Sequence, residues 1–160
     1  MTQDDLSKIE RELNIRLPEE YRRVMVDYPF ASSSFAQDCE LPDDPDRVIE
    51  SNRQLRREGF FGQPWPQSRF SFGGDGSGNE YYLDLKQSPS PVFLADHEGS
   101  DVEVEAPDFA SWVGDRAREY AKWEREDRLT CCLCSTPPCC CSPSVQCGPG
   151  GRAVTGHSDG

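Results

Sequence analysis

Residues 69–85 read Arg69-Phe70-Ser71-Phe72-Gly73-Gly74-Asp75-Gly76-Ser77-Gly78-Asn79-Glu80-Tyr81-Tyr82-Leu83-Asp84-Leu85. Polar and apolar side chains alternate on both sides of a glycine-rich centre, and such alternation is typical of β-strands. Glycine and asparagine readily adopt the backbone conformations that tight turns require. This segment therefore predicts a β-hairpin whose two antiparallel strands are joined by a turn at 73–79.

Two further strands and a helix are expected after the hairpin. Pro91–Ala95 is a short apolar run, and Asp101–Glu105 alternates strictly between acidic residues and valine. The second pattern predicts an edge strand with its charges pointing outward. A last helix is expected from Pro107, since apolar residues then recur at helical spacing at Phe109, Trp112, Val113, Ala117 and Tyr120.

Helices are expected before the hairpin. Thr2 and Asp5 have the spacing of a capping box at the start of a first helix. A second helix is expected from Pro18, as its first residue, to Pro29. A third is expected from Pro45 or Asp46 to Glu58, with Gly59 as its stop. Residues 31–46 between them read as a polar, acidic loop. Helices, then antiparallel strands, then a helix predict an α+β fold and not an α/β fold.

The C-terminal part of the chain has a different composition. Residues 129–160 contain seven of the eight cysteines, many Pro and Gly, and only Arg152 and Asp159 as charged residues. This composition predicts a folded domain at 1–128 followed by a disordered, low-complexity tail at 129–160. The tail cysteines could bind soft metal ions, form disulfides in an oxidising compartment or be acylated. Their crowding differs from the spacing of zinc modules, so no metal site is assigned.

The chain is strongly acidic, with 29 Asp and Glu against 17 Lys and Arg and a net charge of −12. Nucleic acids and anionic membranes need Lys and Arg to neutralise them, so direct binding to either is disfavoured and a basic protein partner is favoured. No run approaches the roughly 18 apolar residues of a membrane span. The first residues lack a signal-peptide pattern, so a cytoplasmic protein is expected.

The glycine-rich turn does not match a nucleotide-binding or calcium-binding motif. A dinucleotide site requires a third glycine where Asn79 stands, and a P-loop requires Gly-Lys-Ser/Thr. A strand follows the turn, so no helix N-terminus is available to hold a phosphate. For an EF-hand that begins at Asp75, the sixth and twelfth positions would be Glu80 and Lys86 in place of Gly and Glu. The sequence predicts no cofactor.

Asp96-His97-Glu98 is the strongest candidate for a catalytic cluster. A histidine near carboxylates can act as a general base. On an extended chain, however, adjacent residues point to opposite faces. The sequence offers His97 no obvious nucleophile or second ligand, so a structural or interaction role is favoured, and no catalytic residue is assigned.

Four segments together resemble the SUKH superfamily, also called the Smi/Knr-like family. Residues 9–21, with Leu17-Pro18-Glu19-Glu20-Tyr21, resemble its opening signature, although Asn14 stands where glycine is usual. Both residues tolerate the left-handed conformation that ends a helix. Residues 72–85 resemble its glycine-rich hairpin, 91–98 its next strand, and 109–113 its closing helix.

The resemblance implies an α+β fold with a central antiparallel sheet flanked by helices. It also implies a non-enzymatic bacterial immunity protein that binds and neutralises a toxin domain, often a nuclease, of a polymorphic toxin system. An acidic inhibitor suits a toxin surface that is basic where it contacts phosphate. The alternative is a non-catalytic regulatory scaffold of the Smi/Knr-like type. The candidate partner-binding residues are the carboxylates of the acidic loop, of the cluster after the third strand and of the edge strand: Asp38, Glu40, Asp43, Asp44, Asp46, Asp96, Glu98, Asp101, Glu103 and Glu105.

Overall fold

The computed structural model describes residues 1–32, 34–98 and 102–131. The chain divides into two compact units, Met1–Ala121 and Lys122–Gly160, and the fold below is that of the first. Its elements follow in the order α1 (Gln3–Leu13), α2 (Glu19–Val26), η1 (Ala36–Glu40), α3 (Pro45–Glu58), β1 (Arg69–Gly74), β2 (Glu80–Asp84), β3 (Val92–Ala95), β4 (Val102–Ala106) and α4 (Phe109–Cys131). The expected α+β architecture is confirmed.

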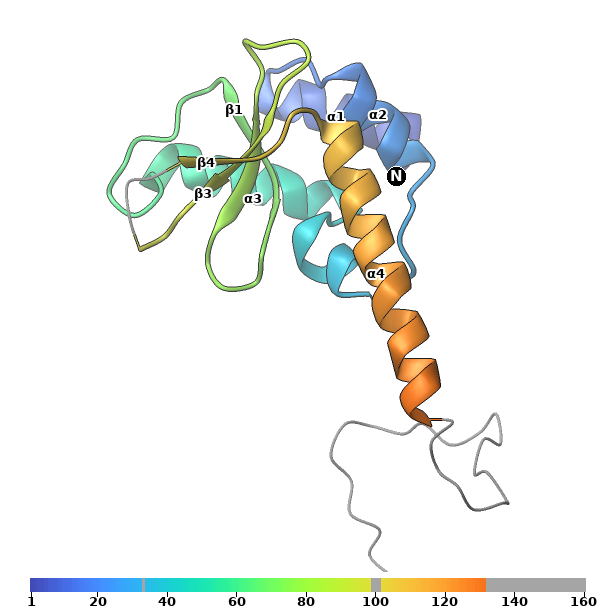
Figure 1. Ribbon diagram of the computed structural model, residues 1–160. Coiled ribbons are helices and arrows are strands. Elements are labelled where there is room, and N and C mark those ends of the chain that lie inside the picture. Colours follow the sequence, from blue (N-terminus) through green and yellow to red (C-terminus); the bar gives the residue numbers. More distant parts are fainter. Residues whose placement is uncertain (33, 99–101, 132–160) are drawn as a thin grey trace, which may run out of the picture. The chain divides into compact units, whose positions relative to one another are not determined.

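The sheet is antiparallel throughout and has the strand order β1-β2-β3-β4 (Figure 1). The expected hairpin is formed by β1 and β2, and the expected edge strand is β4. A β-bulge interrupts the register between Ser71 and Gly73. A Cβ added at Gly73 would lie 2.1 Å from the backbone oxygen of Glu40, so only glycine allows η1 to pack so closely there.

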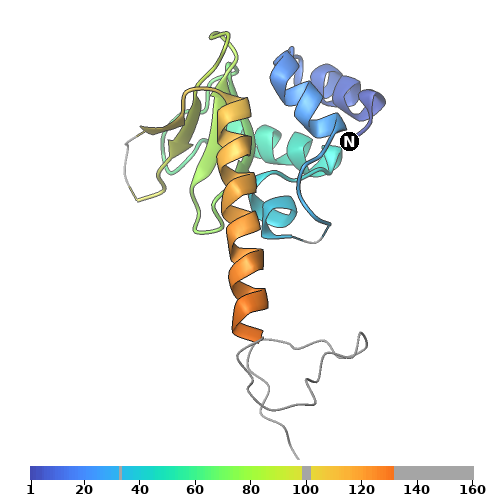
Figure 2. The same ribbon diagram turned by 45° about the vertical axis from the view of Figure 1, so that its right-hand side comes forward.

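Helices α1, α2 and α4 lie on one side of the sheet (Figure 2). Together with Val48 and Ile49 of α3, they enclose the main core. In it, Tyr21 of α2 packs edge-on against Phe70 of β1, and Phe72 packs edge-on against Trp112 of α4. A smaller cluster packs against the opposite face of the sheet, and its members are Leu55, Phe60, Trp65, Tyr82 and Ala95. The sheet is therefore covered on both faces along β1, β2 and β3.

Helix α3 covers the outer edge of β1 through one buried side chain. Asn52 Oδ1 accepts a 3.0 Å hydrogen bond from the backbone N–H of Ser71, and Asn52 Nδ2 donates a 2.7 Å bond to the Ser71 carbonyl oxygen. Both backbone groups are thereby satisfied without another strand. This contact closes the edge of the sheet that β1 would otherwise expose.

The helix ends agree with the capping predictions. Thr2 and Asp5 form the expected capping box of α1, and Asn14 ends α1 in the left-handed conformation. Gly59, at a φ of 78°, stops α3 as expected. Helix α2 is shorter than predicted: Pro18 is its N-cap and not its first residue, and it ends at Val26 before reaching Pro29.

The segment 31–46 is not simply a polar loop. It contains the π-helical turn η1, and Ala36, Glu40, Leu41 and Pro42 within it are buried. The Tyr28 hydroxyl donates a hydrogen bond to the Leu41 carbonyl oxygen, which fixes the segment against the residues that follow α2. The many charged residues of this segment gave no indication in the sequence that part of it is buried.

The predicted boundary between 128 and 129 stays a prediction, and helix α4 runs through that position to Cys131. The predicted tail from residue 132 onward lies outside the described residues.

Candidate partner-binding surface

The glycine-rich turn is organised by the carboxylate of Asp75. This carboxylate accepts hydrogen bonds from the backbone N–H groups of Ser77 and Asn79, from the Ser77 hydroxyl and from Asn79 Nδ2, at 2.7–3.2 Å. Burial raises the pKa of Asp75, but these hydrogen bonds outweigh it and leave the pKa below its usual value. The turn is therefore a fixed structure held by one ionised side chain.

Aromatic side chains flank the turn on two sides. A Cβ placed on Gly76 would lie 2.7 Å from Cζ of Phe35, and one on Gly78 would lie 3.4 Å from Cγ of His97. The rings of His97 and Phe61 are 5.6 Å apart between centroids. Phe35 and Phe61 are 48 % and 65 % exposed, which is unusual for phenylalanine. Segments distant in sequence thus bring two exposed aromatic rings to one turn.

The carboxylates of Asp96 and Glu98 both approach His97. Oδ1 of Asp96 lies 3.8 Å from His97 Nδ1, and Oε1 of Glu98 lies 3.9 Å from His97 Nε2. The expectation that these side chains point to opposite faces is wrong, because β3 ends at Ala95 and the chain then bends. Asp96 Oδ1 accepts the backbone N–H of Glu98 at 2.9 Å, which stabilises the bend.

An open pocket of about 440 Å³ connects this bend to the turn and to β4. His97 is held at its wall by Asn79, whose Oδ1 accepts from the His97 backbone N–H at 2.9 Å and lies 2.6 Å from Nδ1. The residues that line the pocket are Ser77, Asn79, Leu94, Asp96, His97, Glu98 and Glu103. Three of the predicted partner-binding carboxylates therefore meet at one hollow.

The carboxylates of the acidic loop at 31–46 differ in the partners that they contact. Asp38, on η1 near Phe35, is exposed. Asp44 caps α3 by accepting from the backbone N–H groups of Asp46 and Arg47, Asp43 accepts from Gln37, and Asp46 pairs with Lys8 at 2.6 Å. Three of these residues thus have structural partners, whereas Asp38 is exposed three residues after Phe35, whose ring lies against the glycine-rich turn.

Glu40 and Glu105 converge on one arginine of α4. Arg116 Nε lies 3.6 Å from Glu40 Oε1, and Arg116 NH2 lies 3.6 Å from Glu105 Oε2. The Tyr120 hydroxyl donates a 2.8 Å hydrogen bond to the other oxygen of Glu40. Glu40 is buried, so its carboxylate faces the protein and not a partner. Asp101 lies outside the described residues.

Comparison with known protein families identifies a match over most of the chain. The SUKH_6 family model, described as SMI1-KNR4 cell-wall, matches residues 3–113. The chain belongs to the SUKH superfamily. No curated protein and no solved structure matched the chain.

The matched SUKH region contains all four strands and the whole glycine-rich turn. It also contains the residues around the glycine-rich turn, from Phe35 to Glu103. Within the described residues, no helix has the length and apolar character that a membrane crossing requires. The same residues contain no group of three or more His, Cys, Asp or Glu arranged to hold a metal ion.

Glu80 is a residue of the SUKH domain that sequence reasoning missed. It opens β2, and the Ser71 hydroxyl donates a 2.6 Å hydrogen bond to its Oε2. Burial raises its pKa to about 7. The sequence pattern predicts an exposed side chain for a glutamate at the end of an alternating strand. In the structure, η1 and α3 pack over β1 and enclose Glu80.

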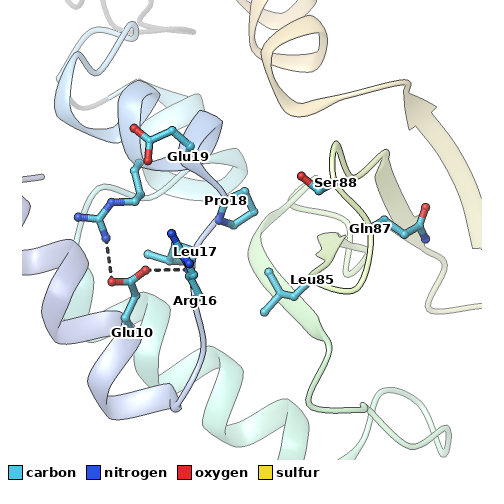
Figure 3. A pocket seen from close by; sticks show the side chains of 9 residues that line it. Glu10, Arg16, Leu17, Pro18, Glu19, Leu85, Gln87 and Ser88 are labelled. Atoms are coloured by element: carbon cyan, nitrogen blue, oxygen red, sulfur yellow. Dashed lines mark hydrogen bonds and ion pairs between the residues drawn. The ribbon is translucent and has the colours of Figure 1, made fainter.

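The largest hollow described in this SUKH domain, about 530 Å³, lies apart from the acidic residues predicted to bind a partner (Figure 3). Its lining comes from the α1–α2 connection and from the segment after β2. Glu10 there accepts a 2.9 Å bond from the Leu17 backbone N–H and pairs with Arg22 at 2.8 Å. These contacts brace the start of α2, so we assign the carboxylate a structural role and the hollow no ligand.

Proposed function

We propose that this SUKH protein is an immunity-type binding module that neutralises a basic, nuclease-like toxin domain by direct contact. The contact surface is the glycine-rich turn with its neighbours, hereafter the turn surface: Phe35, Asp38, Phe61, Asp96, His97, Glu98 and Glu103. Family membership and a net charge of −12 support a protein partner of opposite charge.

The single observation that carries the proposal is the pairing of exposed aromatic rings with exposed carboxylates around one rigid turn. Phe35 and Phe61 supply large apolar contacts, which dominate the binding energy of many protein interfaces. Asp38, Glu98 and Glu103 are exposed beside them and form an acidic rim. The hydrogen bonds to Asp75 keep the turn in one conformation, so little entropy is lost on binding.

The test begins with a pull-down from the native host, using the full chain as bait, washed at low and high salt. A captured toxin domain is then co-expressed with the chain in a bacterial strain whose growth it arrests. We expect the wild-type chain to restore growth, and high salt to weaken the complex, since salt screens opposite charges. Growth arrest that persists beside a well-expressed wild-type chain would contradict the proposal. Several weak partners, with none a toxin, would instead favour the regulatory scaffold.

A matched pair of charge-reversal variants tests the location of the surface. The first combines Asp38→Lys, Glu98→Lys and Glu103→Lys. The control combines Asp27→Lys, Glu50→Lys and Glu58→Lys, which are also exposed and change the net charge equally. We expect growth to be restored by the control only. Equal loss in both variants would show that net charge alone, and not the turn surface, governs binding.

A further inference from the structure

The two outer strands of the sheet, β1 and β4, differ in whether another element occupies the backbone groups on their outer side. Asn52 of α3 occupies backbone groups on the outer side of β1. Strand β4 pairs with β3 on one side, and no strand among the described residues pairs with its other side. The hydrogen-bonding groups on that side are available to a further strand.

The side chains of β4 do not protect this edge. Natural edge strands are commonly blunted by lysine, proline, a bulge or a covering helix. Val102, Glu103 and Val104 pair in unbroken register with Ala95, Leu94 and Phe93, and the bulge lies beyond them. Val102 is 42 % and Val104 63 % exposed, although the alternating pattern would bury the valines of a half-covered strand. Glu103 and Glu105 are exposed as expected, but the valines on the opposite face of β4 are exposed as well.

We propose that β4 is a docking strand, which adds an extended segment of the partner to the sheet, and that this segment alternates basic and apolar residues. The proposal rests on the proposed function for the class of partner and adds how the partner is held. Backbone hydrogen bonds along the edge supply affinity, and the side chains of alternate residues supply selectivity.

Charge selects a basic segment over a second copy of this chain. Glu103 shares the acidic pocket with Asp96 and Glu98, so basic side chains on the same face of an added strand gain favourable contacts. A second β4 would bring Glu103 and Glu105 beside identical carboxylates, which repel. The apolar residues of the added strand would lie beside Val102 and Val104 and cover them.

The probe is an acetylated, amidated peptide of alternating lysine and valine, titrated into the isotope-labelled full chain and followed by NMR. We expect the largest shifts at the amides of 102–106 and slower hydrogen exchange there. The same peptide with methylated backbone amides keeps its charge but cannot donate hydrogen bonds. We expect it to bind at least about tenfold more weakly, because each lost hydrogen bond contributes to the difference. Equal affinity of the two peptides, or shifts confined to other segments, overturns the proposal.

A double variant, Val102→Lys with Val104→Lys, places charged side chains at two exposed positions of β4, as in protected edge strands. We expect it to lose peptide binding at unchanged thermal stability, whereas Val26→Lys on exposed α2 leaves binding intact. If the wild-type chain neutralises a toxin and this variant does so equally well, the docking strand is wrong and the immunity function stands. If the peptide binds β4 but no toxin is neutralised, the docking strand stands and the immunity function is wrong.

Discussion

The guanidinium of Arg116 lies 3.6 Å from the buried carboxylate of Glu40, and the two residues come from α4 and η1. Arg116 also pairs with Glu105 and Glu119, and donates a 3.2 Å hydrogen bond to the Tyr81 hydroxyl. Its charge faces the rings of Tyr81 and Trp112 at 5.8 and 5.7 Å. One side chain thus joins η1, β2, β4 and α4.

Replacing Arg116 by alanine leaves the Glu40 carboxylate buried without its cation. We expect a loss of about 3 kcal/mol in the free energy of unfolding, measured by chemical denaturation. Arg118→Ala is the control, since Arg118 pairs with Asp115 at an exposed position and its removal should cost below about 1 kcal/mol. Similar losses in the two variants would contradict the role given to Arg116.

Removing the Asn52 side chain exposes two backbone groups of β1. Asn52→Ala should lower the free energy of unfolding by about 2–4 kcal/mol, since both groups of Ser71 lose their partner in a buried place. The opened edge should also promote self-association, which light scattering detects. Gln54→Ala, on the exposed side of α3, removes only an exposed hydrogen bond to Glu58, so it should cost below about 1 kcal/mol and leave self-association unchanged.

Glu80 makes stability depend on pH. Its pKa in the folded chain is raised to about 7 from 4.5, so the folded state binds the proton more tightly than the unfolded state. Its contribution to stability is therefore present at low pH and is lost as pH rises from 4.5 through 7. Glu80→Gln should gain stability relative to wild type over this interval in denaturation experiments.

Glu58 is the control for that experiment. Hydrogen bonds from Gln54 and Arg57 lower the pKa of Glu58, so the stability it contributes is lost as pH falls. Glu58→Gln should not reproduce the gain above pH 4.5. A Glu80→Gln curve parallel to wild type would refute the raised pKa of Glu80.

The exposed aromatic rings should dominate partner binding. Phe61→Ser is expected to weaken toxin binding by tenfold or more, about 1.4 kcal/mol, as truncation of an interface anchor does. Val26→Ser, at a residue 41 % exposed on α2, should leave the affinity unchanged. Calorimetric titration measures both, and an unaffected Phe61→Ser variant would place the contact elsewhere.

We also predict that 1–128 folds without 129–160. Both hydrophobic clusters lie before residue 114, so truncation after Arg128 removes none of their members. Thermal unfolding of the truncated chain should remain a single cooperative transition with a midpoint close to that of the full chain. A broad or absent transition would show that the C-terminal part contributes to the core.

The sequence predicted the elements whose signals are local. The hairpin at 69–85, the Thr2–Asp5 capping box and the Gly59 stop each depend on a few neighbouring residues, and all three are confirmed. The buried half of the acidic loop could not be predicted. Leu41 and Glu40 are enclosed by Tyr28, Arg116 and Tyr120, which lie far along the chain.

The candidate site was predicted only in part. Composition indicated acidic residues, but it did not separate Asp38, which is exposed, from Asp44, which caps a helix. The aromatic component was missed because the sequence alone does not distinguish an exposed phenylalanine from one in the core. Their exposure depends on where η1 and the turn after α3 lie relative to the hairpin.

The hydrogen bonds of the Asp75 carboxylate fix the shape of the turn, whereas the proposed partner contacts belong to the side chains around it. Ser77 and Asn79 satisfy that carboxylate inside the turn, whereas Phe35 and His97 lie against the turn from outside and Phe61 packs against His97. Substitutions among the surrounding residues can therefore change what is recognised and leave the turn intact. For the proposed immunity function, this arrangement would let new specificities against a changing toxin arise without a new fold.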